Sequence, residues 1–162
     1  MGRVKIHGSS LTLGLACLAL SLLCGGCRTA SEKLLLNTTG PEWRVQQGQA
    51  LWRAGKQYPE LGGDLVLARN SDGSCVMQFT KTPFSLVVAQ TTLTNWYIEF
   101  PPRRLSFAGH LPPPTRFAWL YLPAALAGQG LPPRFRFLRK PDGGWRLENT
   151  HSGETLEGFL SP

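Results

Sequence analysis

Histidine and the motifs of known catalytic sites are scarce in this chain of 162 residues. Two of its three histidines, His110 and His151, lie among turn residues, which predicts solvated loop positions. After residue 27, the sequence holds no His-x-x-x-His, Gly-x-Ser-x-Gly or paired-cysteine motif and no phosphate-binding glycine loop. Catalysis needs a nucleophile, base or metal set placed together. We therefore expect no catalytic residue, no metal site and no enzyme activity.

Two carboxylates, Glu154 and Glu157, lie three residues apart on a predicted closing strand. Successive side chains of a strand point to opposite faces, so this odd spacing places the two carboxylates on opposite faces. They cannot flank one substrate bond as a paired acid and base. An unrecognised hydrolase is therefore less favoured than the two non-enzymatic functions described below.

The sequence also lacks an apolar run long enough to span a bilayer. The run Leu11–Leu23 has 13 residues, whereas a transmembrane helix needs about 20. Arg3 and Lys5 precede the run, and small residues follow it at positions 25 and 26. This order of a basic head, an apolar middle and small residues is typical of a secretory signal peptide.

Cys27 follows the two small residues directly, so Leu22-Leu23-Cys24-Gly25-Gly26-Cys27 resembles the lipobox of bacterial lipoproteins. The resemblance implies a thioether-linked diacylglycerol on Cys27, cleavage after Gly26 and an acylated new amino terminus. It departs from the usual pattern at Cys24, where a leucine is common. Two alternatives stay open: a transmembrane helix that is never cut, and lipidation at Cys24. Acyl chains gain about 0.8 kcal/mol per buried methylene, so two or three of them anchor a protein.

Arg28 stands directly after the proposed lipid site. In well-studied bacterial lipoproteins, an aspartate at this position marks retention in the inner membrane. By that resemblance we expect a lipid anchor in the bacterial cell envelope, in the outer membrane and facing the periplasm.

These features divide the chain into a signal peptide (1–26), the lipidated Cys27 with a tether (27–41) and one β-rich domain (42–162). The last part is long enough for one domain with a real core and too short for two. Once the signal is removed and Cys27 is acylated, Cys75 is the remaining free cysteine. We expect no intrachain disulfide and a small buried or half-buried thiol at Cys75. No cofactor is expected apart from the covalent lipid.

The charge of the chain is modestly positive. Removal of the signal takes Arg3 and Lys5 from 17 basic side chains and none of the ten acidic ones, which leaves a net charge of +5. The basic residues cluster at Arg103-Arg104 and in the group Arg134, Arg136, Arg139 and Lys140. The second cluster alternates along a predicted strand, so we expect its charges to share one face. For an exported chain we expect no nucleic-acid partner; a solvated face or anionic lipid headgroups fit better.

Alternation of apolar and polar residues predicts a succession of short strands. They are expected at 64–69, 75–80, 84–90, 95–100 and 104–107, and again at 135–137, 145–147 and 155–159. Short turns such as Asn70–Gly73 favour antiparallel pairing. Residues 43–51 read as a strand that Gly48 could bulge, with a helix as the alternative.

Between the two strand groups, apolar residues repeat at three and four positions, which is the helical period. Thr115 is a candidate N-cap, and Pro123 must end or restart the helix because it lacks an amide hydrogen. We expect two short helices at 115–122 and 123–127, with Gly128 as the C-terminal stop.

The predicted fold is mainly β (α+β): an antiparallel curled sheet of about eight strands, or half-barrel, with a short helical lid between the strand groups. The inner face is expected to carry Trp43, Val66, Phe79, Leu86, Val88, Trp96, Ile98, Phe107, Phe135, Phe137, Trp145 and Leu147. These side chains either form a solid core or leave an apolar cavity for acyl chains under the lid.

The segment 117–132, FAWLYLPAALAGQGLP, lies between strands and resembles the corresponding part of LolB, the outer-membrane lipoprotein receptor. Phe100-Pro101-Pro102 with Arg103-Arg104-Leu105 is also similar to the strand that precedes the receptor's helices. The resemblance covers roughly 62–160 and implies the half-barrel that LolB shares with its soluble relative LolA. The amino-terminal helix of that family is weak or missing here. The receptor's protruding apolar loop has its nearest counterpart at 58–63.

Two non-enzymatic functions follow from these observations. The first is a LolB-like module that binds lipoproteins or acyl chains in an apolar cavity and aids their localisation to the outer membrane. It predicts a continuous apolar pocket under 117–126, with cavity or lid residues Trp96, Ile98, Phe107, Phe117, Leu120, Tyr121, Leu126, Phe135 and Phe137. The alternative is a structural or assembly lipoprotein with a filled core that binds other envelope proteins.

Overall fold

Short turns connect most of the strands, and every strand pair is antiparallel. The computed structural model describes residues 38 and 40–161, all within the unit Ser31–Pro162. The signal peptide, Cys27 and nearly all of the tether lie outside the described residues. The strands are β1 (Trp43–Arg53), β2 (Leu61–Asn70), β3 (Cys75–Lys81), β4 (Phe84–Thr91), β5 (Asn95–Phe100), β6 (Leu105–His110), β7 (Phe135–Arg139), β8 (Trp145–Asn149) and β9 (Thr155–Ser161).

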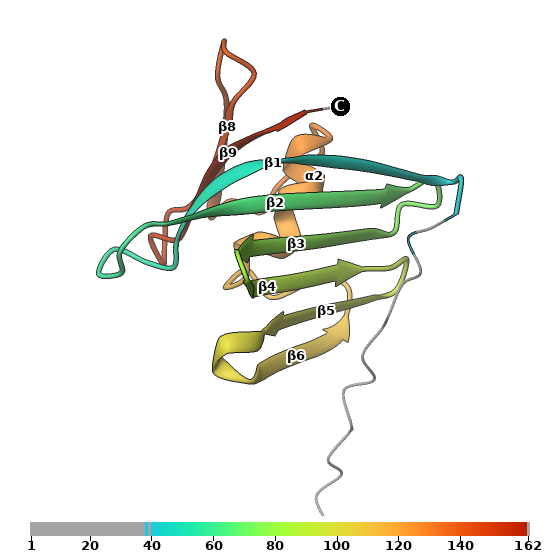
Figure 1. Ribbon diagram of the computed structural model, residues 1–162, viewed down its shortest axis with the longest axis horizontal. Coiled ribbons are helices and arrows are strands. Elements are labelled where there is room, and N and C mark those ends of the chain that lie inside the picture. Colours follow the sequence, from blue (N-terminus) through green and yellow to red (C-terminus); the bar gives the residue numbers. More distant parts are fainter. Residues whose placement is uncertain (1–37, 39, 162) are drawn as a thin grey trace, which may run out of the picture. The chain divides into compact units, whose positions relative to one another are not determined.

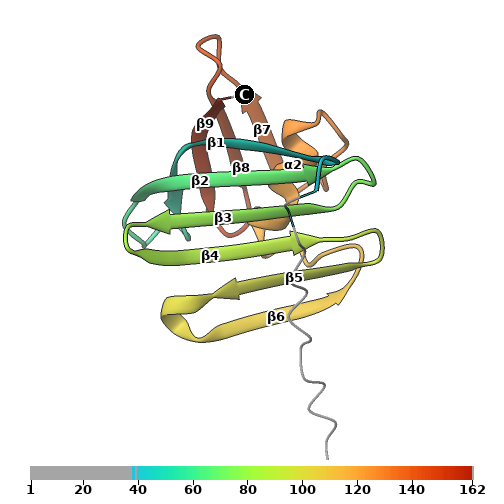
Figure 2. The ribbon, with the colours of Figure 1, turned by 45° about the vertical axis from the view of Figure 1, so that its right-hand side comes forward.

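The described strands form one curled and unclosed sheet in the order β6-β5-β4-β3-β2-β1-β9-β8-β7. Strands β1 to β6 make a meander, and β9 then pairs with the other side of β1. The group β7–β9 turns away from the plane of the meander, and the helix α2 (Leu122–Leu126) lies between the two groups (Figure 1, Figure 2). Strands β6 and β7 remain the two unpaired edges, so the sheet does not close.

The strand predictions are confirmed in existence and order, with corrections at the amino-terminal end. Residues 43–51 belong to β1, so the helical alternative is wrong, and the described sheet has nine strands rather than about eight.

Turn 70–73 has the expected hairpin bond from Gly73 N to Asn70 O, 3.1 Å, and Gly73 has φ of 93°. Glycine accepts that positive φ without a steric penalty.

Gly48 does not bulge β1, because its pairing with β2 and with β9 continues without a break. Instead, two glycines allow the backbones of β1 and β9 to approach closely. A Cβ atom at Gly48 would lie 2.0 Å from the carbonyl oxygen of Phe159, and one at Gly158 would lie 2.2 Å from that of Gln49. These glycines stand where the meander joins the β7–β9 group.

The helical segment is shorter than predicted and begins later. It consists of a 3-10 turn η2 (Ala118–Tyr121) followed directly by α2, and Thr115 is not its N-cap. The carbonyl oxygen of Thr115 instead accepts a bond of 2.7 Å from Asn149 Nδ2. Pro123 stands in the first turn of α2, where its missing amide hydrogen is not needed, so it restarts the helix as expected. Gly128 has φ of 72° just after the helix, as predicted for its stop.

The inner face of the sheet is the one that packs against the helical segment. It carries fully buried residues such as Leu65, Leu67 and Phe79. Trp43, Val66 and Val88 are on the opposite face and half-buried, so their predicted placement was wrong. The register shows this directly, because Val66 lies opposite Gln47 on β1 and Gln78 on β3, and residues opposite each other share a face. The run 65–68 is apolar at every position, so alternation did not identify its inward side.

The basic cluster at 134–140 does not share one face. Arg136 pairs across the ladder with Glu148, whereas Arg139 pairs with Trp145, whose side chain is buried on the inner face. Arg139 donates to the carbonyl oxygen of Leu126 at the end of α2. The two arginines differ by three positions, and an odd separation on a strand reverses the direction of the side chain.

Phe79 provides a test of this inner-face packing. Its ring is fully buried and contacts Trp52 and Trp119 at centroid distances of 6.3 and 5.1 Å. We expect Phe79→Ala to lower the free energy of unfolding by about 3–5 kcal/mol, through lost burial and the cavity left behind. Chemical denaturation measures this change. The matched control is Leu93→Ala, which alters a side chain 70% exposed and should change stability by less than about 0.5 kcal/mol. Equal effects of the two changes would contradict the packing.

Candidate functional site

The helical segment crosses the inner face, and its first residues are buried in an aromatic cluster. Trp119 contacts Trp52 at 5.8 Å and Phe79 at 5.1 Å between ring centroids. Phe117 contacts Trp96 at 5.8 Å and Phe107 at 5.2 Å. The interior beneath this part of the segment is therefore filled by side chains.

The structure brings the predicted cavity and lid residues together, but mainly as core. Trp96, Ile98, Phe117, Leu120, Tyr121 and Phe135 are buried, and Phe107, Leu126 and Phe137 are half-buried and packed against the core. Tyr121 and Phe135 are in contact, with ring centroids 4.7 Å apart. The pocket near the helical segment is lined by two members of this set, Leu120 and Tyr121.

This pocket has a volume of about 410 Å³ and opens beside α2, where the segment leaves the aromatic cluster. Its described walls come from the helical segment and from the ends of strands β2, β3 and β4. They are Arg69, Asn70, Gly73, Ser74, Cys75, Thr91, Thr92, Leu111, Pro113, Leu120, Tyr121, Pro123, Ala124, Ala127, Gln129 and Gly130. The pocket is thus displaced from the continuous cavity that was predicted under the whole of 117–126.

Cys75 is the one cysteine among the described residues, and its side chain lines the pocket. Burial raises the pKa of its thiol to about 12, against a smaller opposing effect of the positive charge of Arg69. The thiol is therefore protonated at neutral pH, and only the thiolate is a strong nucleophile. Cys75 contributes a small apolar surface to the pocket, in agreement with the predicted buried thiol.

A buried carboxylate ties the start of the helical segment to the sheet. Glu154 is 6% exposed and accepts two hydrogen bonds, one from Trp52 Nε1 at 3.0 Å and one from the backbone N–H of Ala118 at 3.1 Å. Asn149 makes a second tie through its bond to the carbonyl oxygen of Thr115. Both tying residues flank the turn between β8 and β9. The start of the segment is therefore held by two side chains of a single hairpin.

The protonation of Glu154 is set by its burial. Desolvation raises the pKa of its carboxyl group to about 7, and the bonds from Ala118 and Trp52 oppose that shift in part. No lysine, arginine or histidine forms an ion pair with it within the described part of the chain. Glu154 lies directly before β9 rather than on the predicted closing strand. Its partners are 36 and 102 positions away, so no local pattern indicates this role.

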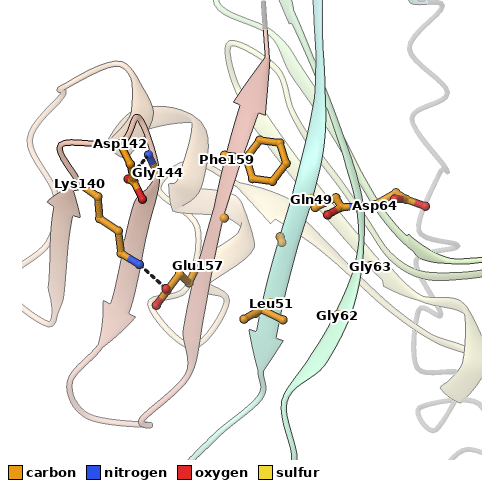
Figure 3. A pocket seen from close by; sticks show the side chains of 12 residues that line it. Gln49, Leu51, Gly62, Gly63, Asp64, Lys140, Asp142, Gly144, Glu157 and Phe159 are labelled. Carbon is orange, nitrogen blue, oxygen red and sulfur yellow. Dashed lines mark hydrogen bonds and ion pairs between the residues drawn. The ribbon is translucent and has the colours of Figure 1, made fainter.

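The outer face has a larger depression, of about 620 Å³, where the meander meets the β7–β9 group (Figure 3). Leu51 and Phe159 are exposed beside it. Lys140 pairs with Glu157 at its other side, and this hydrogen bond is the main reason why the pKa of Glu157 is lowered. Glu157 and Glu154 lie on opposite faces, as their spacing predicted. Its described lining combines four glycines and the charged residues Asp64, Lys140, Asp142 and Glu157 with apolar surface from Ala50, Leu51 and Phe159.

The exposed apolar loop residues differ from those expected. Leu61 begins β2 and packs half-buried against the core, so it does not protrude from the 58–63 loop. The exposed aromatic side chains at this end are Tyr58, in the same loop, and Phe84, which is 67% exposed after the turn between β3 and β4. His110 and His151 are exposed, as predicted, but His110 is the last residue of β6 rather than a loop residue.

Within residues 38 and 40–161, no group of three or more His, Cys, Asp or Glu side chains could hold a metal ion. None of the helices in that part is long and apolar enough to cross a membrane.

Glu154 makes stability depend on pH in a way that can be measured. Its folded-state pKa of about 7 exceeds the ordinary value of 4.5, so the folded protein binds the proton more tightly than the unfolded chain. This group therefore stabilises the fold fully below pH 4.5, and its contribution, about 3 kcal/mol, is lost as pH rises to 7. Glu154→Gln should remove this loss.

Chemical denaturation of both proteins between pH 4.5 and 8 provides the measurement. The difference between the two free energies isolates Glu154, since every other titrating group is common to both chains. If the free energies of unfolding of the two proteins changed equally with pH, Glu154 would not be buried as described.

No family model matches the chain, and a search of the curated proteins found no match.

Proposed function

We propose that this protein is a lipid-anchored, non-catalytic protein of the bacterial cell envelope that holds an acyl chain in the pocket beside α2. The bound acyl chain would be part of a lipid or of a lipid-modified protein, as in the LolB-like function predicted from the sequence. In this proposal the curled sheet is a half-barrel, and η2 with α2 is its lid. The observation that carries the proposal is a pocket at one end of the lid with a largely apolar wall.

The size and chemistry of the pocket support an acyl ligand. A volume of about 410 Å³ falls within the range of roughly 300–1,000 Å³ that is usual for small-molecule sites. The helical wall is formed by Leu120, Pro123, Ala124 and Ala127, and Leu111 faces it from the segment after β6. These side chains offer no hydrogen bond that an acyl chain would leave unsatisfied.

The attachment of the lid supports a change of pocket size on binding. The segment η2–α2 has nine residues, and beyond packing few side chains tie it to the sheet: Glu154 and Asn149 hold its start, and Arg139 of β7 donates to the carbonyl oxygen of Leu126 at its end. A short segment with attachments of this kind can shift as a unit when a ligand enters beside it. Movement of Leu120 and Tyr121 would extend the pocket toward the aromatic cluster.

The anchor places this pocket at a membrane. The lipobox-like sequence ending at Cys27 and the absence of aspartate at position 28 support an outer-membrane lipoprotein that faces the periplasm. The proposed partners are the membrane, through the lipid, and lipoproteins or acyl chains as cargo.

The alternative is a structural or assembly lipoprotein that binds other envelope proteins through its surface. Two observations favour it: the aromatic cluster fills most of the interior, and the outer-face depression places Leu51 and Phe159 in reach of a partner. In that case the pocket beside α2 would bind no acyl chain.

The lipid anchor is tested by metabolic labelling with radioactive palmitate during expression of the full chain in a bacterium. We expect the unmodified chain and the control Cys24→Ser to incorporate label, and Cys27→Ser to incorporate none, because Cys27, unlike Cys24, follows two small residues at the end of the apolar run. Label that persists in Cys27→Ser but disappears in Cys24→Ser would place the lipid on the other cysteine.

The acyl pocket is tested by filling it. Ala124 is half-buried in the helical wall, so Ala124→Trp should occupy the space and weaken binding of a dansyl-labelled fatty acid by about tenfold or more. Fluorescence titration measures the Kd. The control Leu138→Trp adds the same side chain at a residue of β7 that is 58% exposed and outside the pocket, and it should leave the Kd unchanged.

A second pocket-filling change, Ala127→Trp, alters an exposed residue and protects the test against misfolding of the first variant. Unchanged binding in both folded variants would exclude the pocket and favour the assembly function.

A further inference from the structure

We infer that the pocket beside α2 recognises an anionic head on the acyl chain through Arg69, with Arg44 as a second cation. The ligand class is a single-chain anionic amphiphile, with either a carboxylate or a phosphate head. This inference rests on the proposed acyl-binding function and adds to it the selection of a charge.

The register places the two arginines side by side on the inner face. Arg69 of β2 lies directly opposite Arg44 of β1 and opposite Cys75 of β3, and residues in such positions share a face. Cys75 and Arg69 both line the pocket, so this end of the inner face is the end at which the pocket lies. Like charges directly opposite each other on a sheet destabilise it. A bound anion between them would remove that repulsion.

No carboxylate in the described part of the chain compensates these charges. Neither Arg44 nor Arg69 forms an ion pair with any residue that the structure describes. The acidic residue nearest to Arg69 in sequence, Asp72, is in the adjoining turn, where its oxygens accept bonds from Ser74 N at 2.7 Å and Ser74 Oγ at 3.1 Å. Glu42, two positions before Arg44, forms no ion pair with any described residue. None of the described residues that line the pocket is acidic.

Arg69 also has a buried donor that is not used. Its Nε atom is shielded from solvent and has no hydrogen-bond partner among the described residues. A buried polar group without a partner is unfavourable, and more so when it is charged. Guanidinium groups bind carboxylate and phosphate oxygens in a bidentate manner. An anion at this position would satisfy the donor.

The remaining walls define the rest of the ligand. Leu111, Leu120, Pro123 and Ala124 provide apolar surface in the same pocket. A cation beside an apolar wall favours a molecule with a negative head and an apolar chain over either part alone. An inorganic anion would leave the apolar wall in water, and a neutral alcohol would leave Arg69 without a partner.

The test compares four ligands by isothermal titration calorimetry on the folded protein at pH 8: dodecanoate, dodecyl phosphate, dodecanol and inorganic phosphate. We expect both anionic amphiphiles to bind about tenfold or more tightly than dodecanol, and inorganic phosphate to bind weakest. The first two ligands distinguish a carboxylate head from a phosphate head. Arg69→Gln should abolish the preference for the anions while the Kd for dodecanol stays the same.

Two further variants make the result specific. Arg44→Gln changes an exposed side chain, so the fold should tolerate it, and it should reduce the anion preference by severalfold, about two to five. Arg136→Gln removes an exposed arginine of β7 outside the pocket and should leave the preference unchanged.

The outcomes separate this inference from the function on which it rests. Equal affinities of the unmodified protein for dodecanoate, dodecyl phosphate and dodecanol would overturn the anion selection and leave acyl binding in place. An anion preference that survives in both Arg69→Gln and Arg44→Gln would also overturn it. Inorganic phosphate binding as tightly as dodecyl phosphate would remove the acyl chain from the ligand. No binding of any dodecyl ligand would overturn the proposed function itself.

Discussion

The carboxylate of Glu154 is the interaction on which the arrangement of the interior depends. It is buried without a neutralising cation among the described residues, and it joins the indole N–H of Trp52 on β1 to the backbone N–H of Ala118 at the start of η2. A buried carboxyl group that accepts two hydrogen bonds is costly to expose or to mispair. It therefore fixes where the helical segment meets the sheet.

The position of that junction determines what the interior can hold. With Ala118 fixed, Trp119 packs against Trp52 and Phe79 and fills the centre of the inner face. Beside this filled centre, the pocket next to α2 is bounded by the ends of β2, β3 and β4. A solid core and an acyl site are thus compatible in this fold, because they occupy different ends of the same helical segment.

Local patterns were sufficient to predict the strands, their antiparallel order and the helical break at Pro123. They failed where the direction or the partner of a side chain depends on residues far away in the sequence. The apolar run 65–68 has no polar member to mark its outer face, so Val66 was placed inward although it lies opposite Gln47 and Gln78. Glu154 and Trp52 are 102 positions apart, and nothing in either neighbourhood indicates the bond. The role proposed for Arg69 could not be predicted for the same reason, because it depends on Arg44 and on the helical wall of the pocket, which are distant in sequence.

The most direct test of acyl binding in this fold is the location of a bound acyl chain. Backbone amide signals of the isotope-labelled domain, followed by NMR during titration with dodecanoate, report that location residue by residue. We expect the largest shifts in 69–75 and 120–127, around the pocket beside α2. Shifts confined to the outer-face depression around Leu51 and Phe159, or no shifts at all, would contradict it.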